Sequence, residues 1–133
     1  MIAASVWERV EARLVAVQPV ALAAELIRRP SHPGVARQEE AVVRCLADWL
    51  AVHGIAARLE EVAPGRPNLV ARVGRVDGDA PTILFCGHTD TVPLNEGDAG
   101  HGFSGELRDG RLLGRGAADM KGPVAAMAGG VVA

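Results

Sequence analysis

Hydrophobic residues in the first 53 positions recur at the spacing of α-helices. One helix is predicted to begin at Ser5, which forms a capping box with Glu8. A second is predicted to begin near Pro19 and to stop before Pro30, because a residue that precedes proline avoids helical geometry. A third, over residues 38–53, carries one broad apolar stripe. The N-terminal part of the chain is therefore expected to be helical.

From residue 55 the helical spacing ends. Short runs follow in which apolar and polar residues alternate, or in which all residues are apolar. Residues 55–62 and 68–76 predict two strands of a hairpin, with a further turn at Asp77–Asp79. The apolar run Ile83–Phe85, between Pro81 and Gly87, is typical of a short buried strand.

Residues 107–113 surround Asp109-Gly110, a strong signal for a second hairpin, and residues 123–133 predict a last helix. The order of helices, mixed strands and a helix favours an α/β fold, a three-layer sheet with some antiparallel pairing. Gly129-Gly130 and the apolar end after it lack a helix-stop signal. We therefore expect the chain to be the N-terminal part of a longer protein.

Composition limits the classes of function. A chain of 133 residues, 49% hydrophobic and 23% charged, suits one globular domain. The net charge of -2 and an aromatic share of 3% argue against nucleic-acid binding, and no apolar run is long enough to span a membrane. With no evident signal peptide, cytoplasm is the expected location. Cys45 and Cys86 are interpreted as reduced core thiols.

Three residues are candidates for chemistry. His88 and Asp90 lie two positions apart at the end of the predicted strand, so their side chains should leave it on the same side. An imidazole with a carboxylate beside it suits a metal ligand and the group that orients it, although a histidine at a strand end can also be purely structural. Asp119, before the last helix, could either ligate a metal or cap that helix.

Two motifs that include these residues resemble a known family. The segments Gly87–Pro93 and Asp109–Gly122 are similar, in order and content, to the two N-terminal signatures of the zinc aminoacylase and carboxypeptidase family. That family includes acetylornithine deacetylase, succinyl-diaminopimelate desuccinylase and glutamate carboxypeptidase. The resemblance covers most of this chain, but it corresponds to only the first part of the family's full length.

The resemblance implies a site with two Zn²⁺ ions, which Co²⁺ could replace. It implies that His88 binds one zinc, that Asp119 bridges both, that Asp90 orients and tunes the site, and that the peptide bond between Asp119 and Met120 is cis. A shared carboxylate offsets the repulsion between two nearby cations that activate one water. The implied reaction is hydrolysis of an amide bond in N-acyl amino acids or small peptides.

Other parts of the family's pattern are missing. The family places an adjacent glutamate pair after the Asp119 motif, as general base and ligand, then a further carboxylate and a late histidine. Glu39-Glu40 and Glu60-Glu61 precede the motif, and we interpret the first pair as solvated helix residues. Arg115 and Lys121 are interpreted as ion-pairing or surface groups.

We accordingly expect residues 1–133 to be the N-terminal segment of the catalytic domain, without the inserted dimerisation domain and the C-terminal catalytic half. Such a segment should be inactive alone, and the complete protein should be a homodimer. Three alternatives stay open: a non-catalytic remnant, a metal-independent α/β binding module, and a related co-catalytic zinc aminopeptidase.

Overall fold

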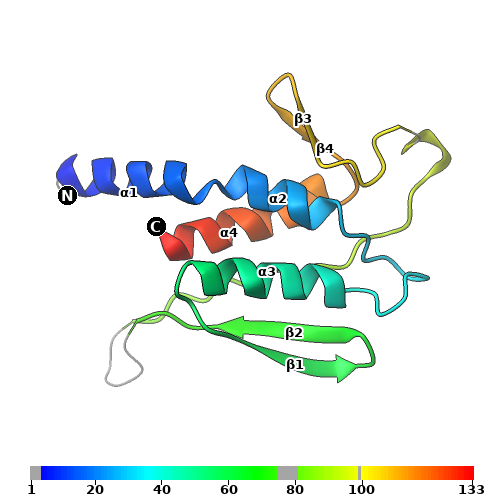
Figure 1. Ribbon diagram of the computed structural model, residues 1–133, viewed down its shortest axis with the longest axis horizontal. Helices are drawn as coiled ribbons and strands as arrows, with labels where there is room; N and C mark the ends of the chain where they lie inside the picture. The colour runs from blue at the N-terminus through cyan, green and yellow to red at the C-terminus, as the bar shows by residue number, and fades with distance from the viewer. Residues whose placement is uncertain (1–3, 75–80, 99) are drawn as a thin grey trace.

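The computed structural model describes residues 4–74, 81–98 and 100–133 of the chain. Its four helices are α1 (Ala4–Val17), α2 (Pro19–Ile27), α3 (Glu40–Val52) and α4 (Gly122–Val132). Helices α1 and α2 follow one another along nearly one line (Figure 1), α4 packs beside both of them, and α3 packs directly against α2. The turn predicted at Asp77–Asp79 lies outside the described residues.

The helix predictions are largely confirmed. Pro19 occupies the first position of α2, after Gln18 in a left-handed conformation. Helix α3 begins two residues later and ends one residue earlier than the predicted range, and α4 begins and ends one residue earlier than the last predicted helix. One boundary differs: α1 already includes Ala4, one residue before the predicted start at Ser5.

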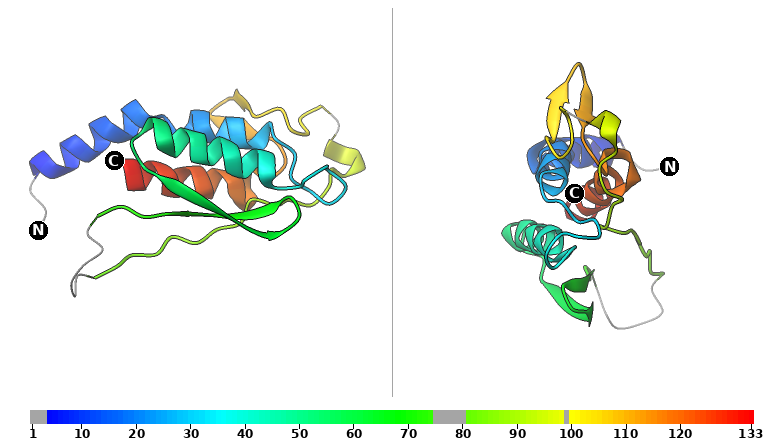
Figure 2. Two further views of the ribbon diagram at one scale, coloured as in Figure 1. Left: turned by 60° about the horizontal axis from the view of Figure 1, so that its bottom comes forward. Right: turned by 90° about the vertical axis from the view of Figure 1, so that its right-hand side faces the viewer.

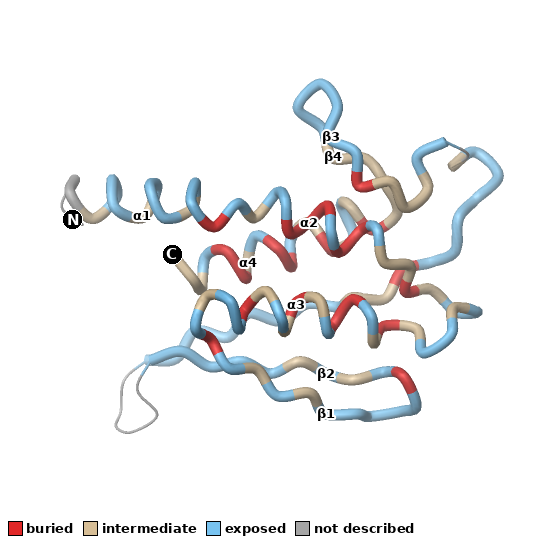
Figure 3. Tube along the Cα trace, in the orientation of Figure 1, coloured by how far each residue is buried: buried red, intermediate tan, exposed pale blue. Residues whose placement is uncertain are grey.

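The hydrophobic core lies where α2, α3 and α4 meet. Helix α2 is almost entirely apolar, and its Leu26 and Ile27 are completely buried. The red segments of Figure 3 show that burial concentrates on these three helices. The core cluster combines residues from all of them and from the start of the first hairpin: Leu22, Ala23, Leu26, Val42, Leu46, Leu50, Ile55, Val124, Ala125 and Ala128.

Both predicted hairpins are present. Strands β1 (Ala57–Ala63) and β2 (Arg66–Ala71) pair antiparallel, with Leu59 opposite Leu69, and lie along α3. Strands β3 (Glu106–Arg108) and β4 (Arg111–Leu113) pair around Asp109-Gly110 and project from the helices (Figure 1).

Helix α3 is joined to the first hairpin by an ion pair. The Glu39 carboxylate accepts hydrogen bonds from Arg66 Nε at 2.9 Å and Nη2 at 2.6 Å. Glu39 is buried and Glu40 half-buried. The interpretation of this pair as solvated was therefore wrong, because the hairpin covers the start of the helix and brings an arginine to it.

The fold expectation is confirmed only at the level of its α/β class. The α/β content agrees with the prediction, but the described strands form two separate two-stranded sheets. The segment Ile83–Phe85 is not a buried strand: it is an extended trace in Figure 2, and its Leu84 is 84% exposed. The physical reason is that no described strand pairs with it and no described element covers its apolar side chains.

The cysteine interpretation was half right. Cys45 packs against the core, whereas Cys86 is exposed in the same extended segment. None of the described helices has the length and apolar character needed to cross a membrane.

Candidate metal centre

The segment that carries His88 crosses the start of α4. A Cβ atom at Gly87 would lie 2.9 Å from Met127 Cε and 3.1 Å from Met120 Cε. A side chain at this position would have to displace the ends of these two methionines, whereas glycine allows the close approach as it stands. Gly87 thus brings the following residue, His88, to the N-terminal end of α4.

Asp119 reaches the same place from the other side. It lies in the turn Ala117–Lys121, which begins after Gly116 in a left-handed conformation with φ 83°. The backbone of Asp119 is extended, at φ -130° and ψ 95°, and the bond between Asp119 and Met120 is cis, as the resemblance implies. Helix α4 begins after Lys121, so Asp119 does not cap it, and that alternative was wrong.

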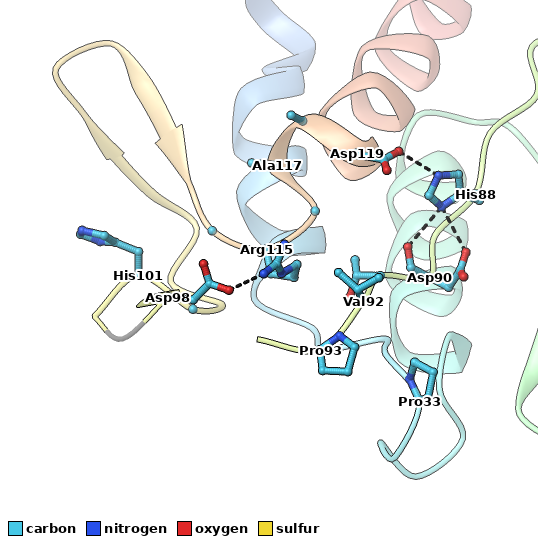
Figure 4. Close-up of a pocket in the computed structure, with 15 residues that line it drawn as sticks. Pro33, His88, Asp90, Val92, Pro93, Asp98, His101, Arg115, Ala117 and Asp119 are labelled. Carbon is cyan, nitrogen blue, oxygen red and sulfur yellow. Dashed lines mark hydrogen bonds and ion pairs between the residues drawn. The ribbon is translucent and has the colours of Figure 1, made fainter. Parts of the chain in front are cut away.

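The three candidate residues meet around one imidazole ring. Nδ1 of His88 lies 3.1 Å from Oδ1 of Asp90, and Nε2 lies 3.0 Å from Oδ1 of Asp119. Nδ1 also lies 3.2 Å from the Asp90 carbonyl oxygen. Figure 4 shows the ring between the two carboxylates. The structure therefore brings together the three residues that the sequence singled out.

The electrostatics of this arrangement favour a cation. Partial burial lowers the pKa of His88, but the hydrogen bonds to Asp119 and to the Asp90 backbone and the two nearby negative charges outweigh it, so the pKa is raised. A neutral imidazole carries one N–H, which can serve one neighbour. If Nδ1–H donates to Asp90, the bare Nε2 faces a carboxylate oxygen with nothing between them. Either a proton or a metal ion on Nε2 removes that repulsion.

The dimensions also fit a metal ion. Two ligand atoms on one tetrahedral zinc, each about 2.0–2.1 Å from it, lie roughly 3.3 Å apart. The 3.0 Å between His88 Nε2 and Asp119 Oδ1 is close to that separation. The Asp119 side chain is 86% exposed, so its second oxygen is accessible to a further ligand. These residues therefore fit a zinc site.

A pocket of about 510 Å³ opens beside the imidazole. His88, Asp90 and Asp119 line one side, and the ion pair of Asp98 with Arg115 lines the other (Figure 4). The pKa of Asp98 is held below its usual value, chiefly by the hydrogen bond from the Asn95 backbone N–H and to a smaller extent by Arg115. This ion pair confirms the interpretation of Arg115 as a structural group.

Lys121 was interpreted wrongly as an ion-pairing or surface group. It is completely buried, and burial lowers the pKa of its amine to about 8. Sequence reasoning also missed Ser31, which lies shortly after the end of α2 and is completely buried. A lysine two positions after a candidate ligand was the available signal, but sequence does not show which side chain turns inward.

Other titratable residues stay away from the imidazole. His53 lies at the end of α3 with Nδ1 2.8 Å from the Trp49 carbonyl oxygen, and His32 stacks on Phe103. His101 lines the far side of the pocket. Across the ranges 4–74, 81–98 and 100–133, no group of three or more histidine, cysteine, aspartate or glutamate residues is arranged to hold a metal ion by itself.

Comparison with known proteins connects this geometry to a family. Residues 84–133 match the sequence model of peptidase family M20/M25/M40. The chain is 44% identical over 112 residues to succinyl-diaminopimelate desuccinylase of Methylorubrum extorquens, covering 82% of this chain and 28% of the relative. The enzyme of the same name from Parvibaculum lavamentivorans is 41% identical over 110 residues, covering 80% and 27%.

A second type of relative aligns over a shorter range. Acetylornithine deacetylase of Vibrio cholerae is 40% identical over 84 residues, which cover 62% of this chain and 21% of that enzyme. The chain thus spans between a fifth and three tenths of the length of these curated relatives.

Proposed function

Since the chain belongs to the M20 metallohydrolases, as an N-terminal portion of them, we propose that it carries the first part of a zinc site that hydrolyses amide bonds. The observation that carries this proposal is the His88 imidazole between two carboxylates, with Nε2 facing Asp119 at 3.0 Å. Such an arrangement is unfavourable for a neutral ring unless a cation lies between nitrogen and oxygen.

Each residue has a separate role in this proposal. His88 and Asp119 hold the metal, and Asp119 has a free oxygen to share with a second ion. Asp90 accepts the Nδ1–H of His88, which fixes the tautomer with Nε2 free and makes that nitrogen a stronger ligand. When bound, zinc lowers the pKa of water and polarises the carbonyl of an amide.

The proposed substrates are N-acyl amino acids or small peptides. This class rests on relatives named for removing succinyl and acetyl groups. The pocket beside His88 is open and large enough for a small molecule, and Asp98 already neutralises Arg115 on its far side. In the described lining of the pocket, Arg115 is thus committed to Asp98 and not to an acyl carboxylate.

We further propose that these residues do not complete the site. Catalytic zinc normally takes three protein ligands and a water, and a positioned base contributes about 10²–10⁴-fold to such a reaction. His88 and Asp119 supply two ligands, and the described residues form no three-ligand cluster. The remaining ligands, the base and a dimerisation domain would come from outside this sequence, with the complete protein a homodimer. The chain alone should bind zinc weakly and hydrolyse no acylated amino acid.

The test is a calorimetric titration of zinc, repeated with Co²⁺ as a spectroscopic probe of the ligands. The wild-type chain is compared with His88→Ala and with His53→Ala, a control histidine at the end of α3. We expect weak binding that His88→Ala abolishes and His53→Ala leaves intact. Equal binding by all three proteins would refute the site. Zinc-dependent hydrolysis of N-acetyl or N-succinyl amino acids by this chain alone would refute the division of the site.

A further inference from the structure

Residues 29–31, directly after α2, contact the backbone of the His88 segment. Ser31 is completely buried, and its Oγ donates a hydrogen bond of 2.6 Å to the carbonyl oxygen of Thr89. The Ser31 carbonyl oxygen accepts from the Thr91 N–H at 3.4 Å. Thr89 lies between His88 and Asp90, so Ser31 fixes the backbone from which both side chains project.

The same three residues also hold the Asp119 segment. Lys121 is completely buried, and its Nζ donates a hydrogen bond of 2.7 Å to the carbonyl oxygen of Arg29. An aliphatic side chain of similar length would pack the same space without desolvating an amine, which is costly. The stability of the core therefore gives no reason for a lysine here, whereas a fixed position of the turn does.

The two segments also contact each other above this anchor. A Cβ atom at Gly116 would lie 2.8 Å from Thr91 Cγ2 and 3.2 Å from Lys121 Cδ. The Lys121 N–H donates to the Gly116 carbonyl oxygen at 2.8 Å. The turn that carries Asp119 is therefore closed by Lys121 and packed tightly against Thr91.

We propose that Ser31 and Lys121 are positioning residues that hold His88 and Asp119 at the separation needed to share a metal ion. Both act through one anchor, the backbone of residues 29–31: Ser31 fixes the segment 88–91, and Lys121 fixes the turn 117–121. The role of these two residues in metal binding rests on the proposed zinc site. The anchor itself is a property of the metal-free chain.

The variants remove one polar group each. Ser31→Ala deletes the hydroxyl, and Lys121→Met keeps an apolar stem of similar length without the amine. Val42→Ala, which removes only buried apolar atoms from α3, is the matched control for a general loss of stability. Two readouts are measured for each protein: zinc affinity by calorimetry, and the nuclear Overhauser effect between the His88 ring protons and the Asp119 β protons without metal.

We expect Ser31→Ala and Lys121→Met each to weaken zinc binding about 10–100-fold, the range for residues that orient metal ligands. Both should weaken the His88–Asp119 Overhauser effect, whereas Val42→Ala should leave both readouts unchanged in the folded protein. Measurements are made where circular dichroism shows each variant folded, and a Ser31→Thr variant, which keeps a hydroxyl, should recover part of the affinity.

The two readouts separate this inference from the proposed function. If wild type shows the Overhauser effect but binds no zinc, the metal site is refuted while the anchor is still tested by the metal-free readout. If wild type binds zinc and both variants keep wild-type affinity and a wild-type Overhauser effect, the positioning role is refuted. Losses in Val42→Ala equal to those in Ser31→Ala would also refute it, since general destabilisation would then explain them.

Discussion

Nε2 of His88 and Oδ1 of Asp119 lie 3.0 Å apart although 31 positions separate the two residues in sequence. A hairpin and a tight turn lie between them, so this contact depends on the whole C-terminal half of the fold. The remaining nitrogen of the ring is occupied by Asp90 at 3.1 Å. Both ring nitrogens therefore have a carboxylate partner in the metal-free chain.

Asp119→Asn should lower the pKa of His88. Although burial acts to lower this pKa, the Asp119 contact is the largest of the effects that raise it. A raised folded-state pKa contributes stability below the unfolded value, and that stability is lost as the pH rises through the folded pKa. The pKa of His88 is measured by NMR titration of its ring protons in the metal-free chain. The control is Asp98→Asn, across the same pocket, which should leave the pH midpoint of the His88 titration unchanged.

Asp90→Ala should weaken zinc binding about 10–100-fold, because the ring loses the carboxylate that fixes its tautomer. The unfolding midpoint should change little, since the Asp90 side chain is 47% exposed. Calorimetry and urea unfolding give the two quantities. Asp48→Ala, an exposed aspartate on α3, is the control, and a larger effect on stability than on zinc affinity would contradict the assigned role.

The sequence was sufficient for the local parts of this arrangement. The two-residue spacing of His88 and Asp90 correctly indicated that their side chains lie together, because that relationship depends on a few backbone torsions. The link to Asp119 came from the order of two motifs, not from spacing. No local pattern reports a contact between residues so far apart in the chain.

Leu26→Ala should destabilise the fold by about 2–5 kcal/mol, because it removes a completely buried side chain and leaves a cavity among three helices. Val20→Ala on the same helix is the control, since Val20 is 53% exposed. Urea unfolding followed by circular dichroism compares the two variants. Similar losses in both would show that α2 does not form the centre of the core.

Arg66→Met should lower the unfolding midpoint more than Arg58→Met does. Arg66 is the partner of the buried Glu39, so its removal leaves a carboxylate without its charge partner, which is costly. Arg58 forms its ion pair with Glu60 on the surface, where such pairs contribute little. Thermal unfolding of both variants checks the order, and the reverse order would contradict it.

Leu84→Glu should reduce self-association without lowering the unfolding midpoint. Ile83, Leu84 and Phe85 are exposed at 80%, 84% and 54%, and neighbouring exposed apolar side chains promote association. Light scattering over a concentration series measures the change. Val15→Glu, on an equally open part of α1, is the control for added charge. A wild-type chain that is monomeric at every concentration would contradict this prediction.

The failures of sequence reasoning share one cause. Burial was predicted from residue type alone. The charged Lys121 and Glu39 were expected at the surface and are buried, whereas the apolar Leu84 was expected in the core and is exposed. Burial depends on what covers a position. The β1–β2 hairpin covers Glu39, and the buried Lys121 points inward to the Arg29 carbonyl oxygen, whereas no described element covers Leu84. Such coverage arises from tertiary contacts, which one sequence does not display.

The β3–β4 hairpin leaves the body of the protein and returns to it, and its return is closed where the Arg115 N–H donates to the Gly102 carbonyl oxygen at 2.6 Å. Its tip, Asp109-Gly110, is exposed, and the hairpin points away from the imidazole (Figure 4). Length added at such a tip is absorbed locally. The hairpin therefore offers an attachment point: a fluorophore or an affinity tag inserted there would report on the chain without altering the spacing of the groups that face the metal.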